Sequence, residues 1–379
     1  MLQHVWTYKP LLQDVLGLKR NRVSVAAEGE PGQGGAAASQ QKHYQVDEGD
    51  FFWQGNGLKP FPAVAEQVEV ELARYRASVE ELNRQTGADV DPLADPSELM
   101  GSSTKNLMSA ISSLPQLTEQ KRVIDKHTNL ATALLGAIKT RALDRFYELA
   151  EELVGGKGGV DAVLKALQPA APGLPGDKLR LALVWLLTAQ PAPQEAEAGR
   201  VEEALRSLGV DARAFAYAWR MRRLNLTGKA HAAPSVAEGL VSLGAGSAQL
   251  GNLLGSTFGQ GLSSLTKGVK SLLAGEQQAA VTVALEALMD SRPRPETESF
   301  LLLDPRGQPG QPTHVSGGFR EAIVFMLGGG NYLEAESLAC WASRAQPAPK
   351  HVVYGATDLL SGDEFVQQLA QLAAMSGTG

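Results

Sequence analysis

Large apolar residues recur every three or four positions over most of the first 224 residues, which is the spacing of one helix face. One such stretch covers residues 64–82. A second stretch, residues 107–114, runs into Pro115, a residue that disfavours continuation of a helix. A third and longer helix is predicted over residues 118–149, with a Gly–Gly pair behind it as the stop. We therefore predict a helical hairpin within residues 97–154 that turns at Pro115. The first stretch carries its apolar residues at positions 64, 68, 72, 75, 79 and 82.

Further helices are predicted between residues 160 and 224, separated by segments rich in proline and glycine. Their predicted ranges are 160–167, 177–187, 195–208 and 212–224. A tract of Gly, Ala, Ser and Gln within residues 24–47 shows no periodicity, and we interpret it as a flexible surface insertion. Residues 1–224 are thus predicted to form one helical domain.

The pattern changes near the C-terminus to alternating strands and helices. Short apolar runs at residues 323–327 and 351–355 are each followed by a helical stretch, after glycine turns, which predicts a parallel α/β sheet over residues 319–379. A Pro-rich linker, residues 291–318, precedes it. Two parallel strands do not form a stable sheet alone, because both faces must be covered. We expect the partner strands to lie elsewhere, with a position outside this chain as one option.

Length and composition narrow the function classes. A chain of 379 residues has room for two or three domains, and 44% hydrophobic and 20% charged residues suit a globular protein. The net charge of -6 argues against nucleic acid as a partner. A single cysteine, Cys340, favours a reducing compartment, with the cytoplasm as the default. The longest apolar stretch, residues 181–187, is too short to cross a bilayer, so membrane contact is expected to be peripheral.

The sequence contains no complete nucleotide-binding, zinc-binding or catalytic motif of the kinds considered below. The glycine turn at Gly328 lacks the dinucleotide-binding pattern, since Leu333 stands where that pattern needs glycine, and no Gly-Lys-Ser/Thr follows. The histidines show no zinc-binding spacing, and no nucleophile elbow occurs. His127 lies among polar residues, and we interpret it as part of a solvated helix surface rather than as a catalytic base. We predict no enzyme activity, no cofactor and no metal.

Two segments indicate binding. A turn at Pro115 would place Leu114 and Leu117 at an exposed tip that offers a ridge to partner helices, with internal packing as the alternative. Within residues 240–274, large apolar residues at spacings of four, four, three, four and three fall on one helix face, opposite glycine and small polar residues. This composition is typical of a lipid-packing sensor, and a helix folded back on its own domain is the alternative. The apolar face comprises Leu254, Phe258, Leu262, Leu265, Val269 and Leu272.

Five segments are notable, in this order along the chain: His4 to Val23, Phe61 to Ser78, Ser112 to Leu135, Arg320 to Leu338 and His351 to Leu360. These segments resemble the Sec/Munc (SM) family of SNARE-binding vesicle-fusion proteins, ER-to-Golgi (Sly) branch. The segment Ser112 to Leu135 resembles the tip of that family's helical hairpin. Together they cover most of the chain.

The resemblance implies a mostly α fold with an α/β part. It comprises a helical arch domain (1–224), a mobile lid loop (225–290) that touches vesicle membrane, and the C-terminal half of a central α/β domain. It implies binding of syntaxin-type Qa-SNAREs, R-SNAREs and assembled SNARE complexes by a monomer, on the cytoplasmic side of ER and Golgi membranes. The SNARE-binding residues carried over are Leu114, Pro115, Leu117, Lys121, Ile124 and Thr128.

The family's N-terminal domain, which holds the syntaxin N-terminal peptide, and the first half of the central sheet have no counterpart here. We therefore expect a form truncated at its N-terminus, and syntaxin-peptide binding is not carried over. Two rival functions remain open at this point. One is a helical tethering or scaffold subunit that does not template SNAREs, and the other is a nucleotide-dependent enzyme that uses the Gly328 turn.

Overall fold

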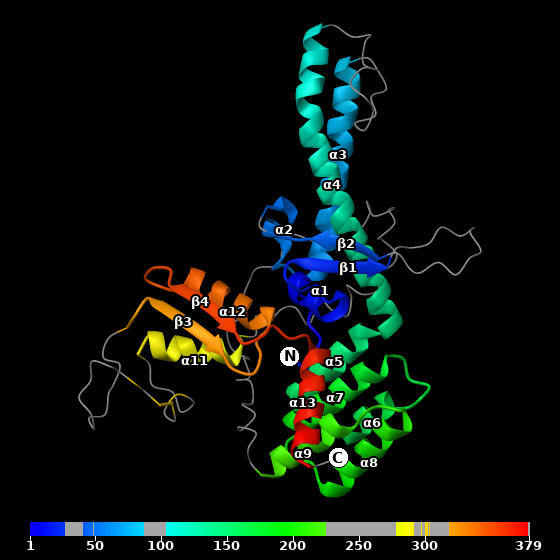
Figure 1. Ribbon diagram of the computed structural model, residues 1–379, viewed down its shortest axis with the longest axis vertical. Helices are drawn as coiled ribbons and strands as arrows, with labels where there is room; N and C mark the ends of the chain where they lie inside the picture. The colour runs from blue at the N-terminus through cyan, green and yellow to red at the C-terminus, as the bar shows by residue number, and fades with distance from the viewer. Residues whose placement is uncertain are drawn as a thin grey trace.

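The computed structural model describes residues 1–26, 41–47, 49–86, 104–224, 278–291, 297, 300, 301, 303 and 318–377, without the side chains of 85–86 and 104–111. The fold is mostly helical with a small α/β part, as predicted from the sequence. A helical body carries a long hairpin of two helices that extends away from it, and the α/β part lies to one side of the body (Figure 1).

The described helices are α1 (Tyr8–Leu16), α2 (Phe51–Asn56), α3 (Phe61–Thr86), α4 (Thr104–Arg141), α5 (Leu143–Val154), α6 (Val160–Ala166), α7 (Pro175–Thr188), α8 (Glu195–Ser207), α9 (Arg213–Arg223), α11 (Ala280–Met289), α12 (Tyr332–Arg344) and α13 (Gly362–Met375). The described strands are β1 (Arg22–Ala26), β2 (Gln41–Gln45), β3 (Glu321–Met326) and β4 (His351–Ala356). Helices α6 to α9 confirm the series predicted between residues 160 and 224.

Two helix boundaries differ from the prediction. Pro115 lies inside α4, so the predicted turn at Pro115 is wrong. The hairpin consists of α3 and α4, and its connection, residues 87–103, lies outside the described residues. The long helix predicted over residues 118–149 is also interrupted, because Ala142 adopts the left-handed conformation (φ 51°) between α4 and α5.

Strands β1 and β2 form an antiparallel pair in which Val23 lies opposite Tyr44. Val23 is fully buried in the core beside α1, whereas most of β2 is exposed. Both strands include residues that the sequence analysis assigned to a flexible insertion, so that assignment is wrong for residues 24–26 and 41–45. Alternation of apolar and polar residues over Arg22–Ala26 is the signal of a strand, and the low-complexity tract beside it obscured that signal.

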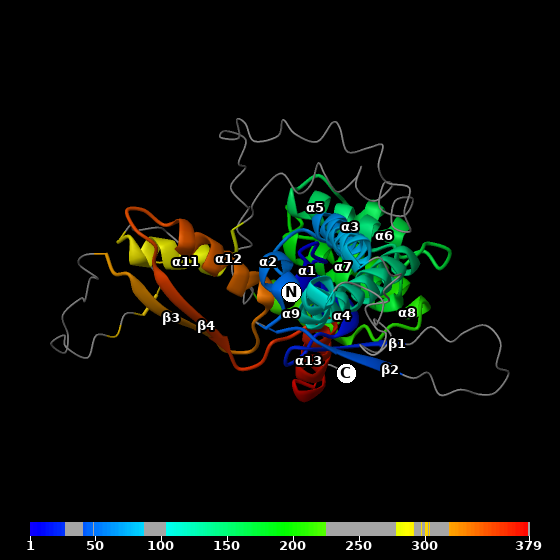
Figure 2. The same cartoon turned by 90° about the horizontal axis from the view of Figure 1, so that it is seen from above.

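The parallel pairing of β3 with β4 confirms the predicted α/β arrangement, with Ile323 opposite Val353. Figure 2 shows α11 and α12 together on one face of these strands. On that face, Val324 and Val352 pack against a small core that includes Leu285, Met289 and Leu338. On the other face the apolar side chains are open to solvent, and Ile323 is 81% exposed. Among the described residues this sheet has two strands.

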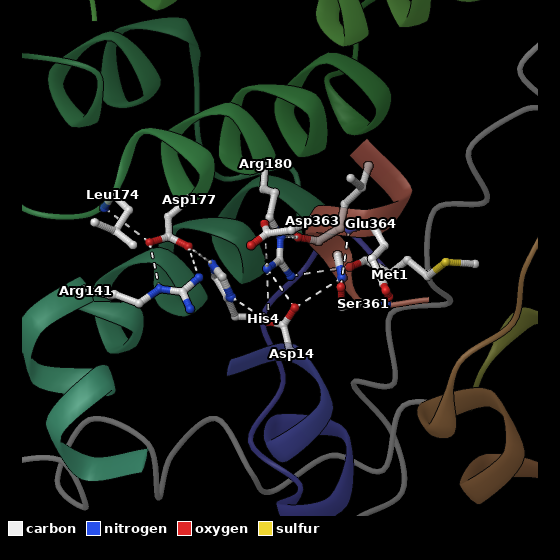
Figure 3. Close-up of polar contacts among 12 residues, drawn as sticks. Met1, His4, Asp14, Arg141, Leu174, Asp177, Arg180, Ser361, Asp363 and Glu364 are labelled. Atoms are coloured by element: carbon white, nitrogen blue, oxygen red, sulfur yellow. Dashed lines mark hydrogen bonds and ion pairs between the residues drawn. The ribbon is translucent and has the colours of Figure 1, made fainter. Parts of the chain in front are cut away.

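A buried ionic network joins the N-terminal segment, α1, α7 and the start of α13 (Figure 3). Arg180 on α7 is 1% exposed and donates to Asp14 Oδ1 (2.8 Å) and Oδ2 (3.0 Å) and to the Leu2 carbonyl (3.0 Å). Gly362 donates its backbone N–H to Asp14 as well, at 3.2 Å. A Cβ at Gly362 would lie 2.3 Å from the Arg180 guanidinium carbon, so this approach requires glycine.

The second half of this network centres on Asp177, which is buried at the start of α7. Arg141 donates to both of its carboxylate oxygens, at 2.6 and 3.1 Å, and the backbone N–H of Leu174 donates at 3.2 Å. Burial alone would raise the pKa of Asp177, but the nearby His4 ring, 3.4 Å away, and the hydrogen bonds from Arg141 hold that pKa at about 2. The C-terminal end of α4 is thereby fixed to the start of α7.

Candidate functional site

The α3–α4 hairpin is the most extended feature of the described molecule. Helix α3 has 26 residues and α4 has 38, which at 1.5 Å per residue corresponds to about 39 and about 57 Å. The two helices lie side by side and project beyond the body, while the other end of α4 continues into it (Figure 1). A pair of helices held in this way can present a long, preformed surface to another protein.

Apolar residues of both helices are buried between them and at the base of the hairpin. On α3 these include Val64, Val68 and Leu82, and on α4 Leu114 and Leu117 are only 8% and 6% exposed. The predicted exposed apolar tip at Leu114 and Leu117 is therefore wrong. Their spacing on one helix face matches internal packing, which was the alternative.

Pro115 itself is exposed, on the side of α4 opposite Leu117. Proline inside a helix removes one backbone hydrogen bond and crowds the preceding turn. Burial of Leu114 and Leu117 on either side offsets this cost and keeps the helix continuous. Close by, the Thr118 hydroxyl donates to the Leu114 carbonyl at 2.8 Å. The proline thus marks a locally weakened point of α4 rather than a turn.

The solvent face of α4 is polar, and we refer to it as the α4 ridge. It is tied by local ion pairs: Arg122 binds Glu119 through two hydrogen bonds of 2.6 and 2.8 Å, and Lys121 lies 3.9 Å from Asp125. Each such exposed pair contributes less than about 1 kcal/mol. The α4 ridge comprises the exposed residues Pro115, Thr118, Glu119, Arg122, Asp125, Asn129 and Thr132.

The other sequence-predicted residues lie at different depths. Lys121 and Thr128 are half-buried beside the α4 ridge, and the Thr128 hydroxyl donates to the Ile124 carbonyl at 2.8 Å. Ile124 is 3% exposed, yet it lines a hollow of about 440 Å³ between α2, α3 and α4. Phe51 and Tyr75 line the same hollow, and Phe51 is 45% exposed. The structure thus brings Ile124 together with an exposed aromatic ring that sequence reasoning missed.

A buried polar cluster fixes the base of the hairpin. His127 is fully buried, and its Nε2 lies 2.9 Å from Asp50 Oδ2 while its Nδ1 lies 2.9 Å from the Tyr8 hydroxyl. Lys126 forms an ion pair with the same Asp50 carboxylate. Asp50 also caps α2, because its Oδ1 accepts from the backbone N–H groups of Phe52 and Trp53, both at 3.0 Å.

The interpretation of His127 as a solvated surface residue is therefore wrong. Burial lowers the pKa of His127, although the Asp50 carboxylate opposes that shift, so the ring is neutral at physiological pH. Its environment is aromatic, with the Phe52 ring centroid 4.5 Å away. The ring links α1, α2 and α4, and this role is structural.

The Gly328 turn, which follows β3, lies against the loop that follows β4. Gly328 and Gly329 have φ values of 99° and 121°, and the Gly328 N–H donates to Thr357 Oγ1 at 3.1 Å. Within the described residues, no group of three or more His, Cys, Asp or Glu side chains is arranged to hold a metal ion. None of the helices in this described part combines the length and the apolar character needed to cross a membrane. The predicted membrane-binding residues, Leu254 to Leu272, lie outside the described residues.

Comparison with known proteins shows to which family this chain is similar. The Sec1 family model matches residues 1–368. The SEC1 family transport protein SLY1 of Oryza sativa subsp. japonica is 41% identical over 384 residues, covering 100% of this chain and 56% of that protein. Sec1 family domain-containing protein 1 of Homo sapiens is 34% identical, covering 98% of this chain and 58% of that protein. The chain thus spans little more than half the length of these relatives.

Solved structures agree with the sequence comparison. The crystal structure of Sly1p in complex with an N-terminal peptide of Sed5p matches 99% of this chain and 57% of that chain, with a TM-score of 0.71 and 26% identity. The structure of the SM protein Vps45 in complex with the Qa SNARE Tlg2 (1-310) matches 100% of this chain and 57% of that chain, with a TM-score of 0.65 and 18% identity. At this identity, the match shows only that the two chains have the same fold.

Proposed function

Because this chain belongs to the Sec1 family, we propose that it binds SNARE helices along the α3–α4 hairpin and aligns them for assembly in ER-to-Golgi vesicle transport. One structural relative was solved with an N-terminal peptide of Sed5p, a contact that is not carried over to this chain, and the other with the Qa SNARE Tlg2. We extend Qa-SNARE binding to this chain, together with binding of an R-SNARE and of assembled SNARE complexes. We propose that the protein acts as a monomer on the cytoplasmic face of ER and Golgi membranes.

The observation that carries this proposal is the exposed α4 ridge on a hairpin that projects from the body. A SNARE motif becomes helical when it pairs, so it loses conformational entropy on assembly. A preformed helical surface that holds two such segments in register reduces the entropy lost when they meet. This work requires shape and differential binding, and no catalytic group.

The hollow lined by Phe51, Tyr75 and Ile124 supplies the apolar part of the proposed surface. Exposed aromatic rings beside a hollow are typical anchors for partner side chains. The α4 ridge, in contrast, offers hydrogen-bonding and charged groups that set the register of a docked helix. The hollow and the α4 ridge lie on different faces of α4, so each is proposed to make its own kind of contact.

The experiment that tests the proposal measures binding of purified Qa-SNARE and R-SNARE motif peptides to the full chain. Asn129 is exposed on the α4 ridge, so Asn129→Trp blocks the surface sterically without disturbing the buried packing. We expect it to weaken SNARE binding at least about tenfold, an effect of roughly 1.4 kcal/mol. Arg145→Trp, at an exposed position of α5, is the matched control and keeps wild-type affinity.

Equal binding by the Asn129→Trp variant and the wild type would contradict a role for the α4 ridge. Failure of the wild-type chain to bind either SNARE motif would favour the scaffold interpretation instead. A charged substitution at Leu117 is a poorer test, because that side chain is buried and the change would disturb the hairpin itself.

Membrane contact through the lid segment remains a separate proposal, supported by sequence alone. The apolar face from Leu254 to Leu272 would insert where lipid headgroups are loosely packed. The full chain carrying Phe258→Asp should lose binding to small, highly curved liposomes, measured by flotation. Unchanged flotation would exclude this segment as the membrane contact.

A further inference from the structure

A cavity of about 660 Å³ lies between the N-terminal segment of the helical part and α12 of the α/β part. Trp6 and Tyr147 line one wall, and Leu333, Glu336 and Cys340 on α12 line the other. Its size falls within the range of about 300 to 1,000 Å³ that is usual for binding sites of small ligands. The cavity is distinct from the α3–α4 hairpin, and the proposed SNARE binding does not use it.

Each wall carries a buried polar atom without a hydrogen-bond partner among the described residues. On one wall it is the indole Nε1 of Trp6, a side chain that is only 4% exposed. On the other wall it is Oε2 of Glu336. The Trp6 ring packs edge-on against Tyr147 with 5.9 Å between centroids, which holds the indole in place. An indole N–H can only donate and an ionised carboxylate can only accept, so the site calls for a ligand with both an acceptor and a donor.

The charge of the lining favours a cationic ligand. Among the described residues, five carboxylate side chains line the cavity, against one arginine, one histidine and the amino group of Met1. Asp14 is neutralised by Arg180, and Asp290 forms an ion pair with Lys350. Glu336 has no ion pair of this kind within the described part of the chain.

The surroundings of Glu336 likewise lack a positive charge that fully balances its carboxylate. Burial raises the pKa of Glu336 to about 7, and Lys9 on α1 only partly opposes this shift. A buried carboxylate of this kind gains much from a positive charge placed directly against it, because desolvated ion pairs are less screened than exposed ones.

We propose that this cavity binds a short peptide segment that carries a lysine or arginine. The cationic side chain donates to Glu336 Oε2, and a backbone carbonyl of the peptide accepts from Trp6 Nε1. The aliphatic stem of the basic residue lies against the apolar lining, which includes Leu58, Pro60 and Leu333. A segment of about three residues fits the volume.

The test uses the full chain and three capped tripeptides, acetyl-Ala-Lys-Ala-amide and its norleucine and glutamate counterparts, with affinities measured by isothermal titration calorimetry. We expect the lysine peptide to bind and the other two to bind at least about tenfold more weakly. Glu336→Gln keeps the shape of the side chain but removes its charge, and should weaken the lysine peptide by about tenfold or more. Trp6→Phe keeps the ring and removes the donor, and should weaken all three peptides.

Glu148→Gln is the matched control, since it makes the same charge change at an exposed position of α5 outside the cavity. Its affinity for the lysine peptide should equal that of the wild type. Unaltered thermal unfolding of the Glu336→Gln variant verifies that the fold is retained, and if the variant is destabilised the comparison of the three peptides on the wild type still decides.

Three results would overturn the proposal. The first is the absence of saturable binding of the lysine peptide at millimolar concentration. The second is equal binding of the lysine and norleucine peptides, which would show that the carboxylate plays no part. The third is binding of spermidine, used as a free polyamine, without binding of the lysine peptide, which would assign the cavity to a small amine.

Discussion

Replacement of Asp50 by alanine tests the buried cluster that holds the hairpin to the body. The Asp50 carboxylate caps α2, lies 2.9 Å from His127 Nε2 and forms an ion pair with Lys126, all in a buried position. Truncation removes these contacts together. It leaves the ammonium group of Lys126 buried without its counter-charge.

The expected loss of unfolding free energy follows from these contacts. Loss of the helix cap alone costs about 1 kcal/mol. Removal of one partner of a buried ion pair costs about 3 to 5 kcal/mol, and the two terms overlap because one carboxylate makes both contacts. Lys126 keeps a hydrogen bond of 2.8 Å to the Gln45 carbonyl, which softens the loss. We therefore expect the free energy of unfolding to fall by about 3 kcal/mol.

The assay is urea unfolding followed by far-ultraviolet circular dichroism, with hydrogen exchange of α2 and α4 to locate the change. Asp125→Ala is the control, because its carboxylate is exposed and lies 3.9 Å from Lys121, a surface pair worth less than about 1 kcal/mol. The double variant Asp50→Ala, Lys126→Met should recover part of the loss by removing the unpaired charge. Equal destabilisation by Asp50→Ala and Asp125→Ala would refute this reasoning.

Three further predictions concern other parts of the molecule. Arg180→Met leaves Asp14 buried without its guanidinium partner and should lower the free energy of unfolding by about 3 to 5 kcal/mol. Arg200→Met, at an exposed position, should change the free energy of unfolding little. Equal melting temperatures of the two variants would contradict a stabilising role of the buried network. Asp177 has a folded-state pKa lowered to about 2, so its stabilisation is complete above the usual value near pH 4 and is lost as the pH falls through about 2. The Asp177→Asn variant should accordingly show a flatter dependence of unfolding free energy on pH in this window. Ile323→Lys on the open sheet face should reduce concentration-dependent light scattering, and unchanged scattering would show that this face does not drive self-association.

The spacing of apolar residues predicted most of the helices and both parallel strands, because an element that buries one face carries apolar residues at the period of that face. The turn at Pro115 was predicted wrongly, since local propensity favours a break there. Burial of Leu114 and Leu117 on either side of it comes from tertiary packing, and this packing overrides the propensity. The interruption at Ala142 has no local signal, because a left-handed alanine is set by its surroundings.

The depth of polar residues could not be inferred from the sequence. His127 stands among charged neighbours, and its hydrogen-bond partners Asp50 and Tyr8 are 77 and 119 residues away along the chain. A local pattern carries no information about such distant partners. Phe51 and Phe52 are likewise indistinguishable in the sequence, although one is half-exposed beside a hollow and the other is buried.

The most direct test of the central claim is site-specific photocrosslinking from the hairpin. A photoreactive residue is placed at Thr132 on the α4 ridge, or at Arg145 on the body as the reference, and each protein is incubated with the Qa-SNARE and R-SNARE motifs. Docking along the hairpin predicts strong crosslinks from Thr132 and weak ones from Arg145. Crosslinks of equal strength from both positions, or from Arg145 alone, would contradict it.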